Sequence, residues 1–396
     1  MKQQKMFSIF VAMALVLGLV PAVSIAAPME RKIVVFESQF VNEAAQEQLV
    51  AHAGGVKIKK LDLINGMAVY LPSKAAERAL GSASGVLRVD DDVAVEALVS
   101  ANAKGGKPAP AQPSQVLPWG IDRINADLAW ATSAGTDIKV AVLDTGIDLT
   151  HPDLVANVAG GYNAISPLKS AQDDNGHGTH VAGIIAAENN TIGVVGAGPQ
   201  IGLYAVKVLD RRGSGYLSDI VKGLDWAVAN EMQVVNMSLG TSSNVLSFHE
   251  AVQRAHNAGI VLVAAAGNDY GGAVNYPAAY SEVIAVSATD SADNLAYFSS
   301  VGPEVDLAAP GVSILSTYKG KTYKTLSGTS MASPHVAGVA ALVLTGAVGV
   351  YDLDGDGLWD PQEVQNKLEA TAEDLGALGR DAQFGAGLVR ADQAVQ

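Results

Sequence analysis

Three residue types that together can perform nucleophilic chemistry stand far apart in this chain. Ser330 lies between small residues, directly before the apolar, alanine-rich run from Ala332 to Leu344. That run predicts a helix, and the free N–H groups at its N-terminus would favour an anion that forms beside the serine hydroxyl. A single serine before a helix is more often only an N-cap, so the interpretation depends on its partners.

Two further segments contain such partners. Asp144 follows an apolar strand expected at 140–143, where a carboxylate could orient a base, although aspartate is also a common turn residue. His177 leaves a glycine-flanked bend and enters an expected helix. It could instead be a structural histidine, or form a metal pair with His180. The metal interpretation is weak because the His-Glu-x-x-His pattern, with its general base, is missing.

In combination these residues fit acyl transfer. The neutral imidazole of His177 would take the hydroxyl proton of Ser330 during attack on a carbonyl and return it to the leaving amine. Asp144 would fix the imidazole tautomer and stabilise the imidazolium. The developing oxyanion needs a donor, for which the candidates are Asn268 and the backbone N–H of Ser330. Taken alone, Asn268 could equally be a loop residue after a strand.

The elements expected to position these residues alternate between strands and helices after Trp119. Apolar strands are expected at 138–143, 202–208, 234–237, 260–265 and 283–286, with helices at 177–187, 218–229 and 248–258. Strands that are apolar on both faces predict a parallel sheet covered by helices on both sides. In such sheets the working groups gather at the carboxyl ends of the strands.

Composition restricts the class of protein. The chain has 396 residues, 49% of them hydrophobic and 17% charged, which favours large folded units over disorder. Its formal net charge of −14 makes nucleic acid and anionic membrane surfaces poor partners. Cysteine is absent, so any stapling of an exported fold would come from packing or from metal ions.

The N-terminal residues resemble an export signal. Lys2 and Lys5 precede an apolar run at 7–20, and small residues follow at 24–27. We therefore expect a signal peptide at 1–27 and a secreted, soluble mature protein. An uncleaved membrane anchor is the alternative, but the run is short for a bilayer span.

A small α/β unit is expected between Arg31 and Leu98. Strands are expected at 33–36, 56–63, 67–71 and 86–95, with a tight turn at 65–66 and helices at 42–53 and 73–80. The segment 99–114 is rich in Pro, Gly, Ala and Lys and is expected to be a linker. From this pattern alone, the unit could be a binding module or a cleavable pro-segment.

The blocks around Asp144, His177 and Ser330, in that order and with the Asn268 block, resemble the motifs of subtilases, a family of serine endopeptidases. The resemblance covers residues 115–396. It implies a three-layer α/β catalytic domain with a mostly parallel sheet, preceded at 28–98 by a small α/β (ferredoxin-like) propeptide that acts as intramolecular chaperone and inhibitor. The family also implies protein or peptide substrates and a monomer.

The resemblance assigns substrate-binding and processing residues. Two edge segments would hold an extended substrate as an added strand, which suits recognition of many sequences. Their residues are Gly213, Ser214, Gly215 and Tyr216, with Ser238, Leu239 and Gly240 opposite. The main specificity pocket would be lined by Ala265, Ala266, Gly267 and Asn275, whose small side chains leave room for a large apolar group. The family position for self-cleavage falls after Leu98.

One metal motif belongs to this chain and is not implied by the family. Residues 352–363 match the calcium-loop pattern D-x-D-x-D-G-x5-E. The oxygen ligands would come from Asp352, Asp354, Asp356, Asp360, Glu363 and the carbonyl of Leu358. A solvated acidic loop is the alternative, but it would not need glycine and glutamate at these offsets.

The resemblance implies a second Ca²⁺ site. Its ligands would be Gln115, Asp153, Glu188, Asn190, Ile192 and Val194. A weaker cation site near Ala278, Tyr280, Val283 and Asp306 is left open. We expect calcium to replace the missing disulfides as a staple.

Two other functions compete with that of a secreted, self-processing endopeptidase. A catalytically silent calcium-binding scaffold or chaperone is possible on the same fold, since fold alone does not prove activity. An esterase of the α/β-hydrolase type is disfavoured, because its Gly-x-Ser-x-Gly motif is missing around Ser330.

Overall fold

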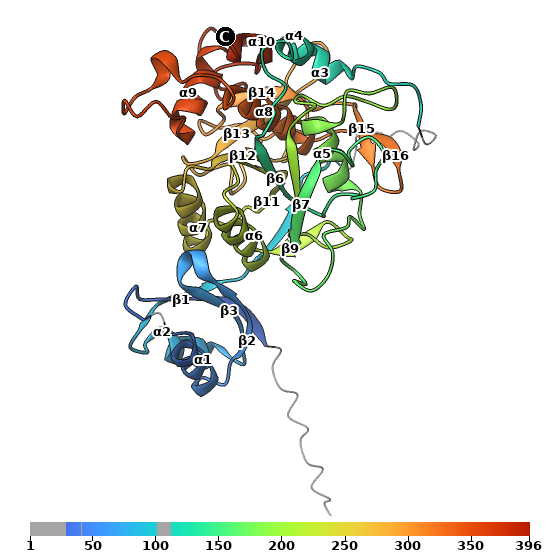
Figure 1. Cartoon of the computed structure of the whole chain (residues 1–396). Coiled ribbons are helices and arrows are strands. Elements are labelled where there is room, and N and C mark those ends of the chain that lie inside the picture. Colours follow the sequence, from blue (N-terminus) through green and yellow to red (C-terminus); the bar gives the residue numbers. More distant parts are fainter. Residues whose placement is uncertain (1–28, 41, 101–111) are drawn as a thin grey trace, which may run out of the picture.

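The computed structural model describes residues 29–40, 42–100 and 112–396. The predicted signal peptide and most of the predicted linker lie outside these residues. The chain forms a small N-terminal lobe and a much larger C-terminal lobe, which contact each other (Figure 1). Within the described ranges, no helix combines the length and the apolar character needed to cross a membrane.

A seven-stranded sheet forms the centre of the larger lobe. In spatial order its strands are β14 (Leu307–Pro310), β13 (Ile284–Thr289), β12 (Val261–Ala265), β10 (Val234–Met237), β6 (Lys139–Asp144), β8 (Gly202–Lys207) and β7 (Val158–Asn163). Every neighbouring pair in this sheet is parallel. Because parallel strands end at one edge, the residues that follow Asp144, Met237 and Ala265 are brought to the same side of the lobe.

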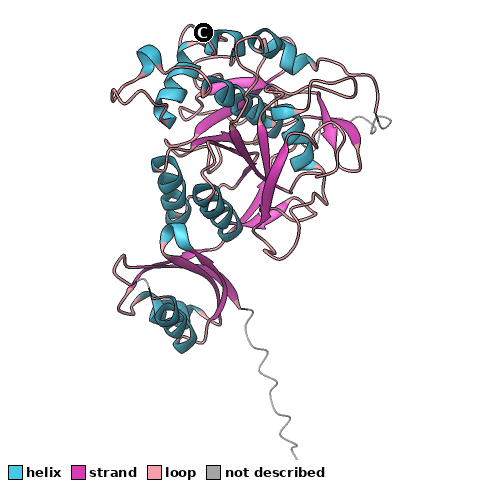
Figure 2. Cartoon of the chain, in the orientation of Figure 1, coloured by secondary structure: helices cyan, strands magenta, loops and turns pink. Residues whose placement is uncertain are grey.

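Helices cover both faces of this sheet (Figure 2). Alternate residues of β6 belong to different cores: Val140 and Val142 pack with one set of helices, whereas Ala141 and Leu143 pack with the other. The first set is α5 (His177–Ala186) and α8 (Thr329–Val343), and the second is α6 (Leu217–Ala229) and α7 (Leu246–Asn257). Because successive side chains of a strand point to opposite faces, each strand contributes to both apolar cores. The predicted three-layer α/β fold is confirmed.

Several elements escaped the sequence analysis. Strand β7 contains Gly160 and Gly161, which lower its strand propensity, and β14 is only four residues long and ends in Pro310. The hairpin of β15 (Ile314–Tyr318) and β16 (Thr322–Leu326) pairs outside the main sheet. Short helices complete the lobe: α3 (Trp119–Arg123), α4 (Ala126–Ala129), η2 (Gly349–Tyr351), α9 (Pro361–Ala370) and α10 (Ala391–Ala394).

The N-terminal lobe is an antiparallel sheet with two helices on one face (Figure 1). Its elements are β1 (Glu30–Phe36), α1 (Glu43–His52), β2 (Val56–Leu61), η1 (Asp62–Ile64), β3 (Gly66–Leu71), α2 (Lys74–Gly81) and β4 (Val86–Asp91), in the sheet order β2-β3-β1-β4. Val34 and Phe36 pack towards α1 and α2, whereas Ile33 and Val35 belong to the core that contains α6 and α7. The second face of the sheet is thus buried by the larger lobe.

One predicted strand of this lobe is wrong. The stretch 86–95 does not form one strand, because β4 ends at Asp91 and the chain then leaves the lobe. The following strand, β5 (Ala94–Ala97), belongs to a separate three-stranded sheet between β11 (Leu239–Gly240) and β9 (Ser214–Tyr216) of the larger lobe. Apolar pattern cannot reveal such a break, since both pieces have extended backbone.

Charged groups fasten the two lobes together. The carboxylate of Asp225 on α6 accepts hydrogen bonds from the backbone N–H groups of Asp62, at 2.8 Å, and Leu63. Lys59 of β2 forms an ion pair with Asp219. Because Asp225 is 8% exposed, loss of its carboxylate would leave two backbone donors without an acceptor at this contact.

Substitution Asp225→Ala is therefore expected to loosen the N-terminal lobe while the larger lobe stays folded. An unmet buried donor costs about 1–3 kcal/mol, so amide exchange around Asp62 to Leu71 should accelerate by roughly tenfold or more. Hydrogen–deuterium exchange measures this directly. Glu231→Gln, an exposed change just beyond the same helix, is the control, and equal exchange in both variants would refute the prediction.

Candidate active site

Asp144 and His177 form a buried hydrogen-bonded pair. Asp144 ends β6 and is fully buried, and His177 begins α5 and is 3% exposed. The ring Nδ1 of His177 lies 2.7 Å and 2.9 Å from the two carboxylate oxygens of Asp144. The carboxylate also accepts the backbone N–H of Thr145 at 2.6 Å. An ionised carboxylate in this position requires the proton on Nδ1 and leaves Nε2 of the neutral ring as an acceptor.

Ser330 lies in the first turn of α8 and is fully buried. Its hydroxyl donates to the carbonyl of Ser238 at 3.0 Å. Nε2 of His177 is buried and has no hydrogen-bond partner among the described residues. The imidazole therefore retains an unused acceptor beside the strand ends.

Asn268 supplies a second unused polar atom. Its side-chain oxygen accepts the backbone N–H and the hydroxyl of Thr329, each at 3.0 Å, which fixes the orientation of the amide. The amide nitrogen is buried and lacks a partner within the described part of the chain. A fixed, unpaired donor next to the start of α8 is suited to hold a developing negative charge.

Strand β5 leads the chain directly to this place. It pairs with β9 on one side and with β11 on the other, both antiparallel. The next residue, Leu98, donates its N–H to the carbonyl of Ser238 at 3.3 Å, and its carbonyl accepts the N–H of Ser330 at 3.4 Å. Two residues later, Ser100 donates to the carbonyl of Ser327 at 3.0 Å. The backbone is therefore hydrogen-bonded on both sides of the Leu98–Val99 bond.

Gly328 makes this approach possible. A Cβ atom at Gly328 would lie 2.5 Å from the carbonyl oxygen of Leu98, which is closer than any real contact. Its φ of 155° is also in the range that favours glycine. A side chain here would push the bound segment away from Ser330.

The two predicted edge segments lie on either side of β5 and pair with it. Ser214, Gly215 and Tyr216 form β9, and Gly213 accepts the N–H of Ala97 at 2.9 Å. Leu239 and Gly240 form β11, directly after Ser238. The edges hold β5 by backbone groups, so they impose no sequence on the strand between them.

A cavity of about 410 Å³ borders Leu98 and is lined by Gly240, Asn268, Asp269 and Asn275, among others. Of the other predicted pocket residues, Ala265 and Ala266 are fully buried, and the α-carbon of Gly267 packs against the amide of Asn275. Asp269 was missed by the sequence analysis, although it follows Asn268 directly. Its carboxylate accepts the Asn275 amide at 2.6 Å and gives the cavity an acidic wall.

The acidic loop folds so that its carboxylates converge. Ligand atoms of Asp352, Asp354 and Asp356 lie within 4.8 Å of one another. The carboxylate of Asp352 accepts the N–H groups of Gly355 and Gly357, at 2.8 and 3.2 Å. Glu363, which is fully buried, accepts the N–H groups of Leu353 and Asp360 at 2.6 and 3.0 Å. This oxygen-only donor set fits Ca²⁺.

The second predicted calcium set also converges. Asp153 is fully buried, and burial raises the pKa of its carboxyl to about 6. Its oxygens accept the amide of Asn190 and the N–H of Val194, both at 2.9 Å. Gln115 donates to the carbonyls of Glu188 and Val194 at 2.9 and 3.3 Å, and Ile192 donates its N–H to Asn190. The six predicted residues therefore lie in one hydrogen-bonded cluster around a buried carboxylate, in which the amides of Gln115 and Asn190 present N–H donors.

Two alternative metal interpretations find no support in the geometry. His180 turns away from His177: its Nε2 donates to the carbonyls of Ile314 and Lys324, at 3.1 and 2.9 Å, and burial lowers its pKa to about 3. At the weaker cation site, Asp306 is already paired with the guanidinium of Arg380 at 2.5 Å. Among the described residues, only the acidic loop gathers three His, Cys, Asp or Glu side chains whose ligand atoms lie within 4.8 Å of one another.

Comparisons with known proteins agree with the geometry. The subtilase family model matches residues 135–387. A thermostable alkaline protease of Halalkalibacterium halodurans is 50% identical over 284 residues, covering 72% of this chain and 74% of the relative. Subtilisin Savinase of Lederbergia lenta is 48% identical over 284 residues, covering 72% and 100%.

A longer match reaches beyond the larger lobe. Subtilisin amylosacchariticus, from Bacillus subtilis subsp. amylosacchariticus, is 40% identical over 362 residues, covering 90% of this chain and 87% of the relative. That length exceeds the residues from 112 to 396, so the similarity extends into the N-terminal lobe. The chain belongs to the subtilase family and is a subtilisin-like serine endopeptidase.

Proposed function

We propose that this chain is the precursor of a secreted endopeptidase that cuts itself after Leu98 and then hydrolyses other proteins through an acyl-enzyme. The observation that carries the proposal is the position of Leu98, whose carbonyl accepts the N–H of Ser330 while its own N–H is held by Ser238. The Leu98–Val99 peptide bond is therefore held beside Ser330 as a substrate's bond would be.

In the proposed reaction, Ser330 is the nucleophile and His177 the base. The hydroxyl of Ser330 leaves the carbonyl of Ser238 and gives its proton to Nε2 of His177, while Oγ attacks the carbonyl carbon of Leu98. Asp144 holds the imidazole by Nδ1 and stabilises the imidazolium. The proton then passes to the nitrogen of Val99 as the C–N bond breaks, and water hydrolyses the resulting ester by the same proton path.

The oxyanion of the tetrahedral intermediate would accept hydrogen bonds from Ser330 N–H and from Asn268. The amide of Asn268 is already fixed by Thr329, so it needs no reorganisation when charge develops on the carbonyl oxygen. Such preorganised donors usually contribute the largest electrostatic stabilisation in this kind of chemistry.

The N-terminal lobe would act as an inhibitor once the bond is cut. Strand β5 lies in the substrate-binding edges, and the lobe behind it is fastened to α6 by Asp225 and Asp219. Two contacts linked by a short connection hold far more tightly than either alone. We assign 28–98 as propeptide, 99–114 as linker and 115–396 as the mature, monomeric enzyme.

Calcium would stabilise the enzyme at the acidic loop and at the Asp153 set. Asp352, Asp354, Asp356, the Leu358 carbonyl, Asp360 and Glu363 would hold one ion; Gln115, Asp153, Glu188, Asn190, Ile192 and Val194 would hold the other. Ca²⁺ would bind the folded state and not the unfolded state, and would therefore stabilise the fold. This matters for a chain that has no cysteine to form disulfides. The proposed leader at 1–27 and the net charge of −14 are consistent with a secreted protein that acts on proteins and not on nucleic acid.

The first prediction from the proposed function concerns the precursor. Wild type should lose the segment that ends at Leu98, whereas Ser330→Ala should keep it covalently attached, because the bond can be cut only by an intact nucleophile. Intact mass and N-terminal sequencing of both products measure this. If both keep the segment, the silent scaffold is the better interpretation; if both are trimmed alike, self-cleavage is wrong.

A second prediction concerns Asn268. Asn268→Ala should lower kcat by about 10²–10³ and leave KM nearly unchanged, because the donor acts on the transition state. This magnitude is taken from subtilisin itself, where the effect of the same loss is known. Steady-state kinetics on a peptide substrate give the two constants separately. An equal rise in KM with unchanged kcat would mean that Asn268 only binds substrate.

The third prediction concerns calcium and uses the inactive Ser330→Ala chain, so that self-digestion does not contribute. Chelation with EDTA should lower the melting temperature by about 5–10 °C, as expected for loss of an ion present at about 100 times its Kd. The loop variant Asp354→Asn/Asp356→Asn should show a smaller decrease on chelation.

The control is Asp137→Asn, an exposed aspartate outside the loop, which should respond like the parent chain. An unchanged melting temperature after chelation would contradict calcium stabilisation altogether. If the loop variant loses as much melting temperature on chelation as the parent chain, the acidic loop is not a calcium site, but the Asp153 set is not excluded.

A further inference from the structure

We propose that Lys207 is a positioning residue that couples the Asp144–His177 pair to the substrate-binding edge at β9. Lys207 is the last residue of β8, and it lies beside Asp144, the last residue of β6, in the register of the parallel sheet. Paired residues of neighbouring parallel strands point to the same face, so the lysine side chain rises next to the triad aspartate. It is 8% exposed.

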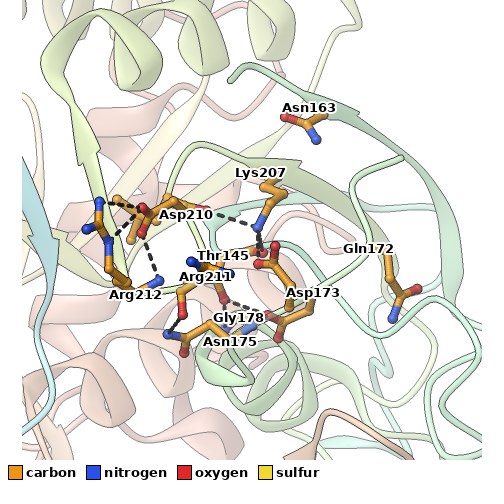
Figure 3. Close-up of polar contacts among 12 residues, drawn as sticks. Thr145, Asn163, Gln172, Asp173, Asn175, Gly178, Lys207, Asp210, Arg211 and Arg212 are labelled. Atoms are coloured by element: carbon orange, nitrogen blue, oxygen red, sulfur yellow. Dashed lines mark hydrogen bonds and ion pairs between the residues drawn. The ribbon is translucent and has the colours of Figure 1, made fainter. Parts of the chain in front are cut away.

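The ammonium of Lys207 has three acceptors, and each belongs to a different functional segment (Figure 3). It donates to the carbonyl of Thr145 at 2.6 Å, directly after Asp144. It donates to the carboxylate of Asp174 at 2.7 Å, in the loop that leads into His177. It also donates to the carbonyl of Leu209 at 3.1 Å, at the start of the loop that leads into β9. All three of its donors are used.

The same segments are joined by a second set of hydrogen bonds (Figure 3). Thr145 donates its hydroxyl to Asp173 at 3.0 Å and accepts the N–H of Gly178 at 2.9 Å. Asn175 accepts the N–H of His177 at 3.1 Å and donates to the carbonyl of Arg211 at 3.1 Å. Lys207 hydrogen-bonds to all three segments through its side chain, beside the backbone bond from the N–H of Leu209 to the carbonyl of Asp144 at 3.1 Å. Its loss would let the segments move relative to one another.

The charge of Lys207 matters as well as its geometry. A buried ammonium is costly unless it is fully hydrogen-bonded, and an apolar side chain of similar volume is often no worse for stability. Its ion-pair partner Asp174 is 55% exposed, so water solvates its carboxylate when the lysine is absent. Removal of Lys207 therefore makes the surroundings of His177 more negative by one charge, and removal of the Asp174 charge makes them more positive.

Other groups around the imidazole of His177 stay constant in such variants. These are Asp144 on β6, Asp173 in the preceding loop, His180 on α5, Glu96 on β5, Asp210, Arg211 and Arg212 before β9, Tyr318 and Lys319 at the end of β15, and Lys324 on β16. Lys319 donates to the backbone carbonyl of Asp174 at 2.7 Å, and its charge contributes equally before and after each substitution. The direction of each change is unaffected.

The test compares Lys207→Met, Asp174→Asn and the double variant in the mature enzyme. A more negative environment stabilises the imidazolium, so the acid limb of the kcat/KM profile should move to higher pH in Lys207→Met, by about half a pH unit. In Asp174→Asn it should move to lower pH, and in the double variant it should return towards wild type. Lys207→Met should also lose tenfold to about a hundredfold in plateau kcat, because small misplacements of reacting groups are costly.

Lys139→Met is the matched control, because it removes the same charge from the opposite end of β6, about 16 Å along the strand. It should leave the acid limb and kcat unchanged. If Lys207→Met and Asp174→Asn shift the limb in the same direction, or shift only the melting temperature, Lys207 is merely structural and the proposal is wrong. If Lys207→Met fails to fold, Lys207→Arg replaces it: this variant keeps the charge but not the ammonium geometry, so a loss of kcat without a shift of the acid limb supports positioning, and an unchanged kcat contradicts it.

The kinetic readout rests on the proposed function, so a second readout separates the two. Proton NMR can follow the titration of His177 in the inactive Ser330→Ala chain with each of the same substitutions. If wild type hydrolyses no peptide, the proposed function fails, and opposite shifts in this titration would still support Lys207. If peptides are hydrolysed but the titration does not respond, only the Lys207 proposal fails.

Discussion

The carboxyl edge of the parallel sheet is the constraint on which the rest of this structure depends. Strands β6, β10 and β12 end side by side, and Asp144, Ser238 and Asn268 come at or just after those ends. Helices α5 and α8 then begin at the same edge and bring His177 and Ser330. Because the two apolar cores fix the strands on both faces, these residues are brought to one edge. There His177 is hydrogen-bonded to Asp144, and the Ser330 hydroxyl donates to the carbonyl of Ser238.

The structure also depends on a gap between the edge strands β9 and β11 that can hold one further strand. β9 and β11 are too short to form a sheet alone, and β5 completes them. The pairing uses backbone groups, so it accepts many sequences, including the segment of the chain's own N-terminal part. Gly328 then allows the carbonyl of Leu98 to approach Ser330. The proposed substrate binding and the proposed self-inhibition would both use this one geometry.

The loops that connect the strands to the helices hold many charged side chains, and these are paired over long sequence distances. Asp225 contacts the backbone of the N-terminal lobe, Lys207 contacts three segments around Asp144 and His177, and Arg380 contacts Asp306. Such contacts link distant parts of a chain that has no cysteine. The acidic loop at 352–363 and the buried Asp153 add sites where a cation could do the same.

Much of this could be predicted from the sequence by itself, because the determining signals are local. Alternating strand and helix periods predicted the three-layer fold, and motif spacing identified the family. The candidate residues Asp144, His177, Ser330 and Asn268 were chosen from their neighbours alone, and their roles stay predictions to be tested.

Only the tertiary structure decided which groups come together. It separated β5 from β4, since a strand's sheet depends on its partners and not on its apolar pattern. It revealed Asp269 in the cavity beside Leu98 and Lys207 beside Asp144, because a charged residue after an apolar strand carries no local sign of its partner. It also paired Asp306 with Arg380, a contact across 74 residues that no local pattern encodes.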